Sequence, residues 1–118
     1  MVDLRNTRVM VVVWAMPGCG ACDEYLPIFE QRLTWFRKNG APFHIWRPGD
    51  VLSKGQIPVM FYDAASDNEE LQAFADRLGV SATPTTYVIA QSGSLKVEGL
   101  VPEAEIDDLL HTAIDANR

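Results

Sequence analysis

Two cysteines stand two residues apart directly after an apolar stretch of the chain. Cys19 and Cys22 are the only cysteines among the 118 residues, and residues 9 to 14 before them are all apolar. Such a β-branched run ending at Pro17-Gly18 is typical of a buried strand that turns into a helix. The start of a helix favours a thiolate at the first sulfur, and the spacing allows the two sulfurs to bond. The pair therefore predicts redox chemistry at a strand-to-helix turn.

The apolar periodicity predicts the other elements. A helix is expected from Ala21 to Lys38, with Pro27 producing a kink inside it and Asn39-Gly40 ending it. Residues 41–56 are rich in proline and glycine and are expected to form mostly a loop, with a short strand at 43–46 as the alternative. The remaining expected elements are strands at 57–62, 85–90 and 95–99, a helix capped by Ser66, and a last helix starting at Pro102.

The order of these elements, β-α-β-α-β-β-α, predicts an α/β fold. Its centre is expected to be a mixed sheet of about four strands flanked by helices. The short polar loop at 91–94 predicts that the last two strands form an antiparallel hairpin. Because no linker or repeat interrupts the pattern, residues 1–118 are expected to form a single domain.

Composition excludes several classes of protein. The net charge of −6 and the pI of about 4.7 argue against a nucleic-acid binder with a basic face. The longest apolar stretch, residues 9–17, is far shorter than the ~20 residues of a membrane-spanning helix. It also makes a poor signal peptide, since Asp3 precedes it and no small-residue cleavage site follows before the cysteines. A cytoplasmic protein without a membrane or nucleic-acid partner is expected.

A cysteine pair in the cytoplasm can be catalytic or metal-binding. A structural zinc site needs four nitrogen or sulfur ligands. His44 and His111 are the other good ligands in the chain, and neither has the spacing of a zinc motif. No metal and no cofactor is therefore predicted.

Several positions together resemble the thioredoxin family. Cys19-Gly20-Ala21-Cys22 at the end of the first strand is similar to the active site of that family, and Trp14-Ala15 looks like the pair that precedes it. Pro27, five residues after the second cysteine, matches the helix-kinking proline. Thr83-Pro84 resembles the cis-proline loop, and Gly99 matches a glycine at the end of the last strand. The resemblance covers most of residues 9–116.

The chain also departs from the family pattern. Pro17-Gly18, with one extra residue, replaces the tryptophan before the first cysteine. Ala21 stands in place of the proline between the cysteines, and Asp23 in place of the lysine after them. The buried aspartate and lysine of the family correspond to valines, which are Val12 or Val13 and Val59. The resemblance thus implies a divergent member.

The resemblance implies a thiol–disulfide oxidoreductase that reduces protein disulfides and is itself reduced by a thioredoxin reductase or a glutathione system. Cys19 would be the nucleophile and Cys22 the resolving cysteine of a monomer. The implied substrate-binding residues are Trp14, Gly18, Gly20, Ala21, Thr83 and Pro84. Two alternatives remain: a binding module or adaptor with non-catalytic cysteines, and a disulfide oxidase or isomerase.

Overall fold

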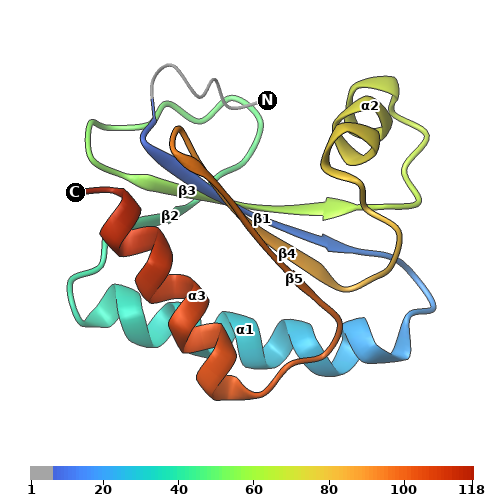
Figure 1. Cartoon of the computed structure of the whole chain (residues 1–118), viewed down its shortest axis with the longest axis horizontal. Coiled ribbons are helices and arrows are strands. Elements are labelled where there is room, and N and C mark those ends of the chain that lie inside the picture. Colours follow the sequence, from blue (N-terminus) through green and yellow to red (C-terminus); the bar gives the residue numbers. More distant parts are fainter. Residues whose placement is uncertain (1–6) are drawn as a thin grey trace.

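A computed structural model describes residues 7–118, so residues 1–6 of the expected domain lie outside the described part. Its centre is a five-stranded sheet with the order β2-β3-β1-β4-β5 (Figure 1). The strands are β1 (Val9–Ala15), β2 (Phe43–Ile45), β3 (Ile57–Asp63), β4 (Thr85–Ala90) and β5 (Gly93–Glu98). The helices are α1 (Gly20–Lys38), α2 (Glu69–Leu78) and α3 (Glu103–Ala116). The expected α/β architecture with a mixed sheet is confirmed.

Strand β1 lies in the middle of the sheet. It pairs in parallel with β3, where Val11 lies opposite Val59, and antiparallel with β4, where Val12 lies opposite Tyr87. Every residue from Val9 to Trp14 is buried. A strand covered on both faces needs apolar side chains on both, which explains its continuous apolar run.

Helices cover both faces of the sheet, and the side chains of β1 alternate between them (Figure 1). Val9, Val11 and Val13 belong to the core that α1 and α3 cover, together with Phe29 of α1 and Leu110 of α3. The intervening residues of β1 belong to a second core, against which the apolar side of α2 packs; they are Met10, Val12 and Trp14.

The structure differs from the sequence-based expectation in two connecting segments. Residues 43–45 form β2, whose Phe43 pairs in parallel with Ile57. The alternative of a short strand within 43–46 is therefore confirmed, and β2 adds a fifth strand to the expected sheet of about four. The start of α2 is capped by Asn68 and not by Ser66, because the Asn68 side chain accepts the Leu71 N–H at 3.1 Å. Ser66 instead accepts the Asn68 N–H at 3.2 Å, within the turn that leads into the helix.

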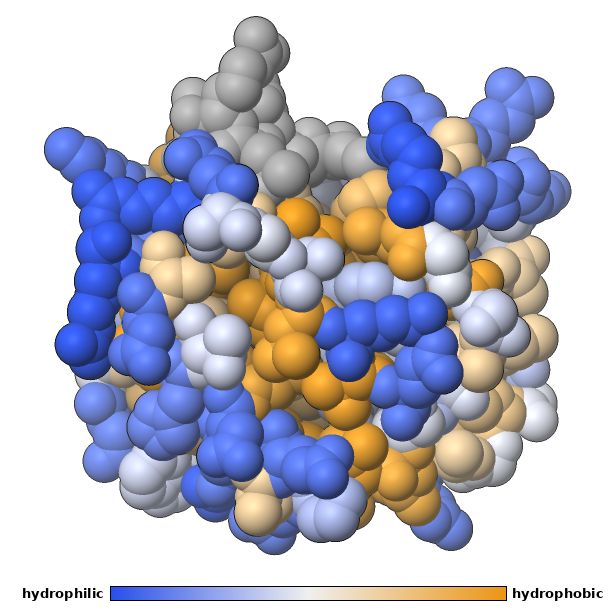
Figure 2. Space-filling view, in the orientation of Figure 1, coloured by the Kyte–Doolittle hydropathy of each residue, from blue (hydrophilic) through white to orange (hydrophobic). Residues whose placement is uncertain are grey.

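The surface is polar around most of the view in Figure 2. Hydrophobic residues gather there in a band between β5 and α3 that continues toward α1. The core beneath the edge strand therefore reaches the surface on this side. Within residues 7–118, no helix is long and apolar enough to cross a membrane.

The core beneath α3 should dominate the stability of the fold. Leu110 is 0% exposed, whereas Leu95 on the edge strand β5 is 39% exposed. We expect Leu110→Ala to lower the free energy of unfolding by about 2 to 5 kcal/mol, because it leaves a cavity, and Leu95→Ala to lower it by less than about 1 kcal/mol. Urea unfolding followed by circular dichroism measures both, and equal losses would contradict this assignment of the core.

Candidate active site

Cys19 and Cys22 form a disulfide at the start of α1, with their Cα atoms 5.2 Å apart. Cys19 is the N-cap of the helix, and its Sγ accepts the Cys22 N–H at 3.1 Å. The free N–H groups of a first helical turn stabilise negative charge on such an atom. Cys22 is 1% exposed, whereas Cys19 is only partly buried. A protein that approaches the pair from outside therefore meets the sulfur of Cys19 first.

The turn around Cys19 carries little side-chain bulk. Gly18 is exposed and has a φ of +76°, a left-handed conformation that favours glycine. Gly20 and Ala21 are also exposed, as the first two residues of α1. A Cβ atom built on Gly18 or Gly20 would meet no atom within 4 Å. The backbone beside Cys19 is thus open to a docking polypeptide.

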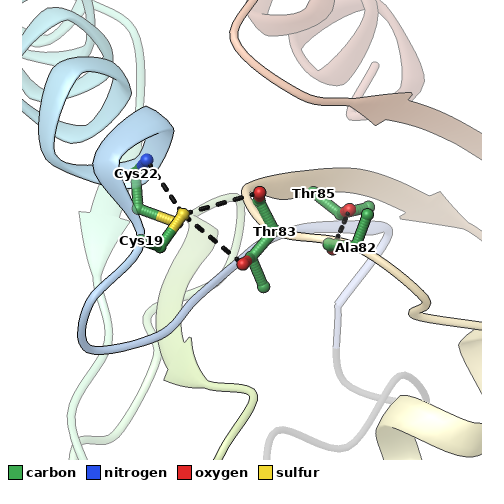
Figure 3. The surroundings of a disulfide bond; sticks show 5 residues. All are labelled: Cys19, Cys22, Ala82, Thr83 and Thr85. Carbon is green, nitrogen blue, oxygen red and sulfur yellow. Dashed lines mark hydrogen bonds between the residues drawn. A yellow bond between two sulfur atoms is a disulfide. The ribbon is translucent and has the colours of Figure 1, made fainter.

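The loop that precedes β4 lies next to the Cys19 sulfur of the disulfide (Figure 3). The carbonyl oxygen and the hydroxyl of Thr83 each lie 3.5 Å from the Sγ of Cys19. The Thr83–Pro84 peptide bond is cis, and the carbonyl of Pro84 accepts the Gly99 N–H at 2.7 Å. In the dithiol state the Cys19 thiol can donate to the Thr83 carbonyl, and the Thr83 hydroxyl can donate to a thiolate or disulfide sulfur. Residues 64 positions apart therefore share one site.

Trp14, expected among the substrate contacts, is 0% exposed. Its ring packs against Tyr62 and Phe74, with centroid distances of 5.3 and 5.8 Å, on the side of the sheet that α2 covers. The Trp14 side chain therefore lies outside the exposed surface around Cys19 in this structure. Trp14 instead packs in the core between the end of β1 and α2.

A buried pair of hydroxyl groups lies one helical turn after Cys22, and the sequence analysis missed it. The hydroxyls of Tyr25 in α1 and Thr86 in β4 are 2.7 Å apart. Burial raises the pKa of Tyr25, while the hydrogen bond to Thr86 offsets part of that shift, so the phenol is neutral near pH 7. A tyrosine on the inner stripe of a helix signals that a polar partner is required.

Neither histidine joins the cysteine pair. His44 Nε2 lies 3.1 Å from the carboxylate of Asp50, and the ring of His111 packs edge-on against Phe36 at 4.9 Å. Among residues 7–118, no three side chains of histidine, cysteine, aspartate or glutamate are grouped so that they could hold a metal ion.

The central strand of a mixed sheet, a disulfide at the start of the next helix and a Thr-Pro loop beside it define a thioredoxin-like protein. The family model described as thioredoxin-like domain matches residues 2–114, and the chain belongs to this family. The Cys19–Cys22 pair fits a divergent member. No curated protein matches the sequence at a significant level.

Solved structures of thioredoxins share the fold. Chloroplastic thioredoxin z superposes with a TM-score of 0.60 and 20% identity over 95% of this chain and 81% of the other. A mutant thioredoxin of Halobacterium salinarum superposes with a TM-score of 0.62 and 20% identity, over 95% of this chain and 80% of the other. Oxidised thioredoxin O2 of Arabidopsis thaliana superposes with a TM-score of 0.62 and 14% identity, over 92% of this chain and 76% of the other. At these identities the likeness concerns the fold.

The pair of Tyr25 and Thr86 hydroxyls can be tested by a double-mutant cycle. Tyr25→Phe leaves the Thr86 hydroxyl buried without its partner, so we expect a loss of about 1 to 3 kcal/mol in the free energy of unfolding of the oxidised protein. The double variant Tyr25→Phe/Thr86→Val removes both groups and should cost less than the sum of the two single changes. Urea unfolding provides the values, and strictly additive losses would show that the two hydroxyls do not interact.

Proposed function

We propose that the protein is a thiol–disulfide oxidoreductase that reduces disulfides of other proteins, with Cys19 as the nucleophile and Cys22 as the resolving cysteine. The supporting observation is the asymmetry of the pair. The accessible sulfur accepts a hydrogen bond at the start of the helix, and the second cysteine is buried behind it. A thiolate, and not a thiol, attacks a disulfide, so the stabilised and accessible sulfur acts first.

The reaction begins with the dithiol form. The Cys19 thiolate attacks one sulfur of the substrate disulfide, that bond breaks, and the leaving thiolate of the substrate takes up a proton. The Cys22 thiol then loses its proton and attacks the Sγ of Cys19, which releases the second substrate thiolate. Two electrons have passed to the substrate and the Cys19–Cys22 disulfide has formed. A reducing partner, such as a thioredoxin reductase or a glutathione system, regenerates the dithiol.

The substrate chain is proposed to lie across the open surface formed by Gly18, Gly20 and Ala21. Thr83 lies next to the Cys19 sulfur, and Pro84 follows it in the same loop. The backbone of Thr83 would pair with the substrate, while its hydroxyl donates to the sulfur as negative charge develops. Trp14 takes no part in this contact, because it is buried.

The charges next to the disulfide support a protein that reduces substrate disulfides over one that forms them. Asp23 lies in the first turn of α1, and Glu24 follows it. Their negative charge offsets part of the positive end of the helix and so reduces the stabilisation of the Cys19 thiolate. A less stable thiolate makes the dithiol form a better electron donor, whereas a strongly stabilised one produces an oxidant.

Substitution of each cysteine tests the roles. In an assay that follows reduction of a disulfide protein by dithiothreitol, we expect Cys19→Ser to lower the rate to the uncatalysed level. Cys22→Ser should instead accumulate mixed disulfides through Cys19, visible by non-reducing electrophoresis and mass spectrometry. Activity that survives in Cys19→Ser would refute the mechanism, and full biological function of the double serine variant would favour the binding module.

The direction of electron flow is tested by the reduction potential of the pair against glutathione. We expect a value closer to the ~−270 mV of thioredoxin than to the ~−120 mV of a strong disulfide oxidant. Asp23→Asn should raise the potential by about 10 to 20 mV, since it removes a charge that opposes the thiolate. Asp108→Asn on the exposed side of α3 is the matched control and should not change it. A wild-type potential near that of the oxidant would refute reduction as the physiological direction.

A further inference from the structure

A hollow of about 260 Å³ opens beside the disulfide, between the start of α1 and the ends of β1 and β3. Cys22 is one of its lining residues, and Leu26 and Phe61 make part of its wall apolar. Met16 stands at it as well, with 42% of its surface exposed. Thr83 and Pro84 do not line it, so it is separate from the loop that borders Cys19 on the other side. Its volume lies below the ~300 to 1,000 Å³ of typical small-molecule pockets and suits a single side chain.

Two acidic residues, Asp23 and Asp63, also line the hollow, and both are exposed. One oxygen of the Asp63 carboxylate accepts the Ala65 N–H at 2.8 Å. Within residues 7–118, neither of them forms an ion pair. Arg32, further along α1, is itself paired with Asp107 at 2.7 Å. The rim of an apolar hollow next to the reactive sulfurs therefore carries negative charge that no lysine or arginine neutralises in the described part of the chain.

We propose that this hollow is a specificity subsite, which takes an apolar side chain of the substrate while Asp23 and Asp63 pair with a lysine or arginine beside it. The proposal rests on the proposed function, since the substrate chain must first dock at Cys19. In the mixed disulfide the substrate cysteine lies next to Cys22, so its neighbours in sequence are within reach of the hollow. The preferred substrates are then disulfides in segments that combine an apolar and a basic residue.

The test uses the pre-reduced full chain and disulfide-linked dimers of short peptides, and compares second-order rate constants. One peptide carries leucine and lysine beside its cysteine, a second carries leucine and glutamate, and a third carries serine and lysine. We expect the first to react roughly tenfold faster than the second at low salt, and the ratio to shrink at about 0.5 M salt. The first should also react faster than the third, because serine does not fill the apolar hollow.

For the variants Asp23→Asn and Asp63→Asn, we compare the rate constant of the leucine–lysine peptide divided by that of the leucine–glutamate peptide. A change in the reactivity of Cys19 affects both rate constants equally, so it cancels in this ratio. Each should lower this ratio by about twofold to fivefold, whereas the matched control Asp108→Asn should change it little. The subsite proposal would be overturned if the leucine–lysine and leucine–glutamate peptides reacted at equal rates. It would also be overturned if Asp63→Asn and Asp108→Asn changed the ratio of these rates equally. Bis(2-hydroxyethyl) disulfide, a neutral substrate without side chains, distinguishes failure of the subsite proposal from failure of the proposed function. If the reduced protein does not react with it, the proposed function itself is overturned.

Discussion

The burial of β1 on both faces is the constraint on which the rest of the structure depends. Its apolar residues require helices above and below the sheet, and its central position requires strands on either side. The chain leaves the sheet after Ala15, so the turn to α1 must lie at the carboxyl end of this strand. Sites in α/β proteins gather at that edge, and here the start of the helix brings its free N–H groups to the Sγ of Cys19.

The same constraint explains why a loop 64 residues away completes the site. Strand β4 runs antiparallel to β1, so its first residue pairs near the last residues of β1, with Thr85 opposite Trp14. The residues just before β4 must therefore lie at the edge where α1 begins. Thr83 reaches Cys19 because of this register, and the hydrogen bond from Gly99 to Pro84 links the loop to the end of β5. The site is thus a product of strand pairing as much as of the Cys-x-x-Cys spacing.

Elements with long apolar patterns were predictable from the sequence, and short or tertiary features were not. β1 and α1 carry enough periodic residues to be placed within a residue or two of their observed bounds. β2 is three residues long, too short to show alternation, and it exists because β3 offers it a partner. The cap at Asn68 was misplaced because Ser66 and Asn68 can both accept backbone N–H groups, and the preceding turn decides between them.

The sequence and its family resemblance indicated that Cys19, Cys22 and Thr83 lie close together, whereas they did not indicate that Trp14 is buried. Alternation along β1 puts Trp14 on the same face of the sheet as Val12, and the packing of α2 on that face buries it. The contact between Tyr25 and Thr86 joins a helix to a strand far along the chain, so no local pattern locates it. The hollow beside Cys22 likewise exists only once β1, β3 and α1 have packed together.

We propose that the two sulfurs differ and that Cys19 is the one that reacts. Alkylation of the reduced protein with less than one equivalent of iodoacetamide at neutral pH, followed by peptide mass spectrometry, tests this most directly. We expect the label on Cys19 in large excess over Cys22, because the sulfur of Cys19 is accessible and accepts the Cys22 N–H, whereas Cys22 is buried. Labelling of both cysteines to the same extent, or of Cys22 first, would contradict it.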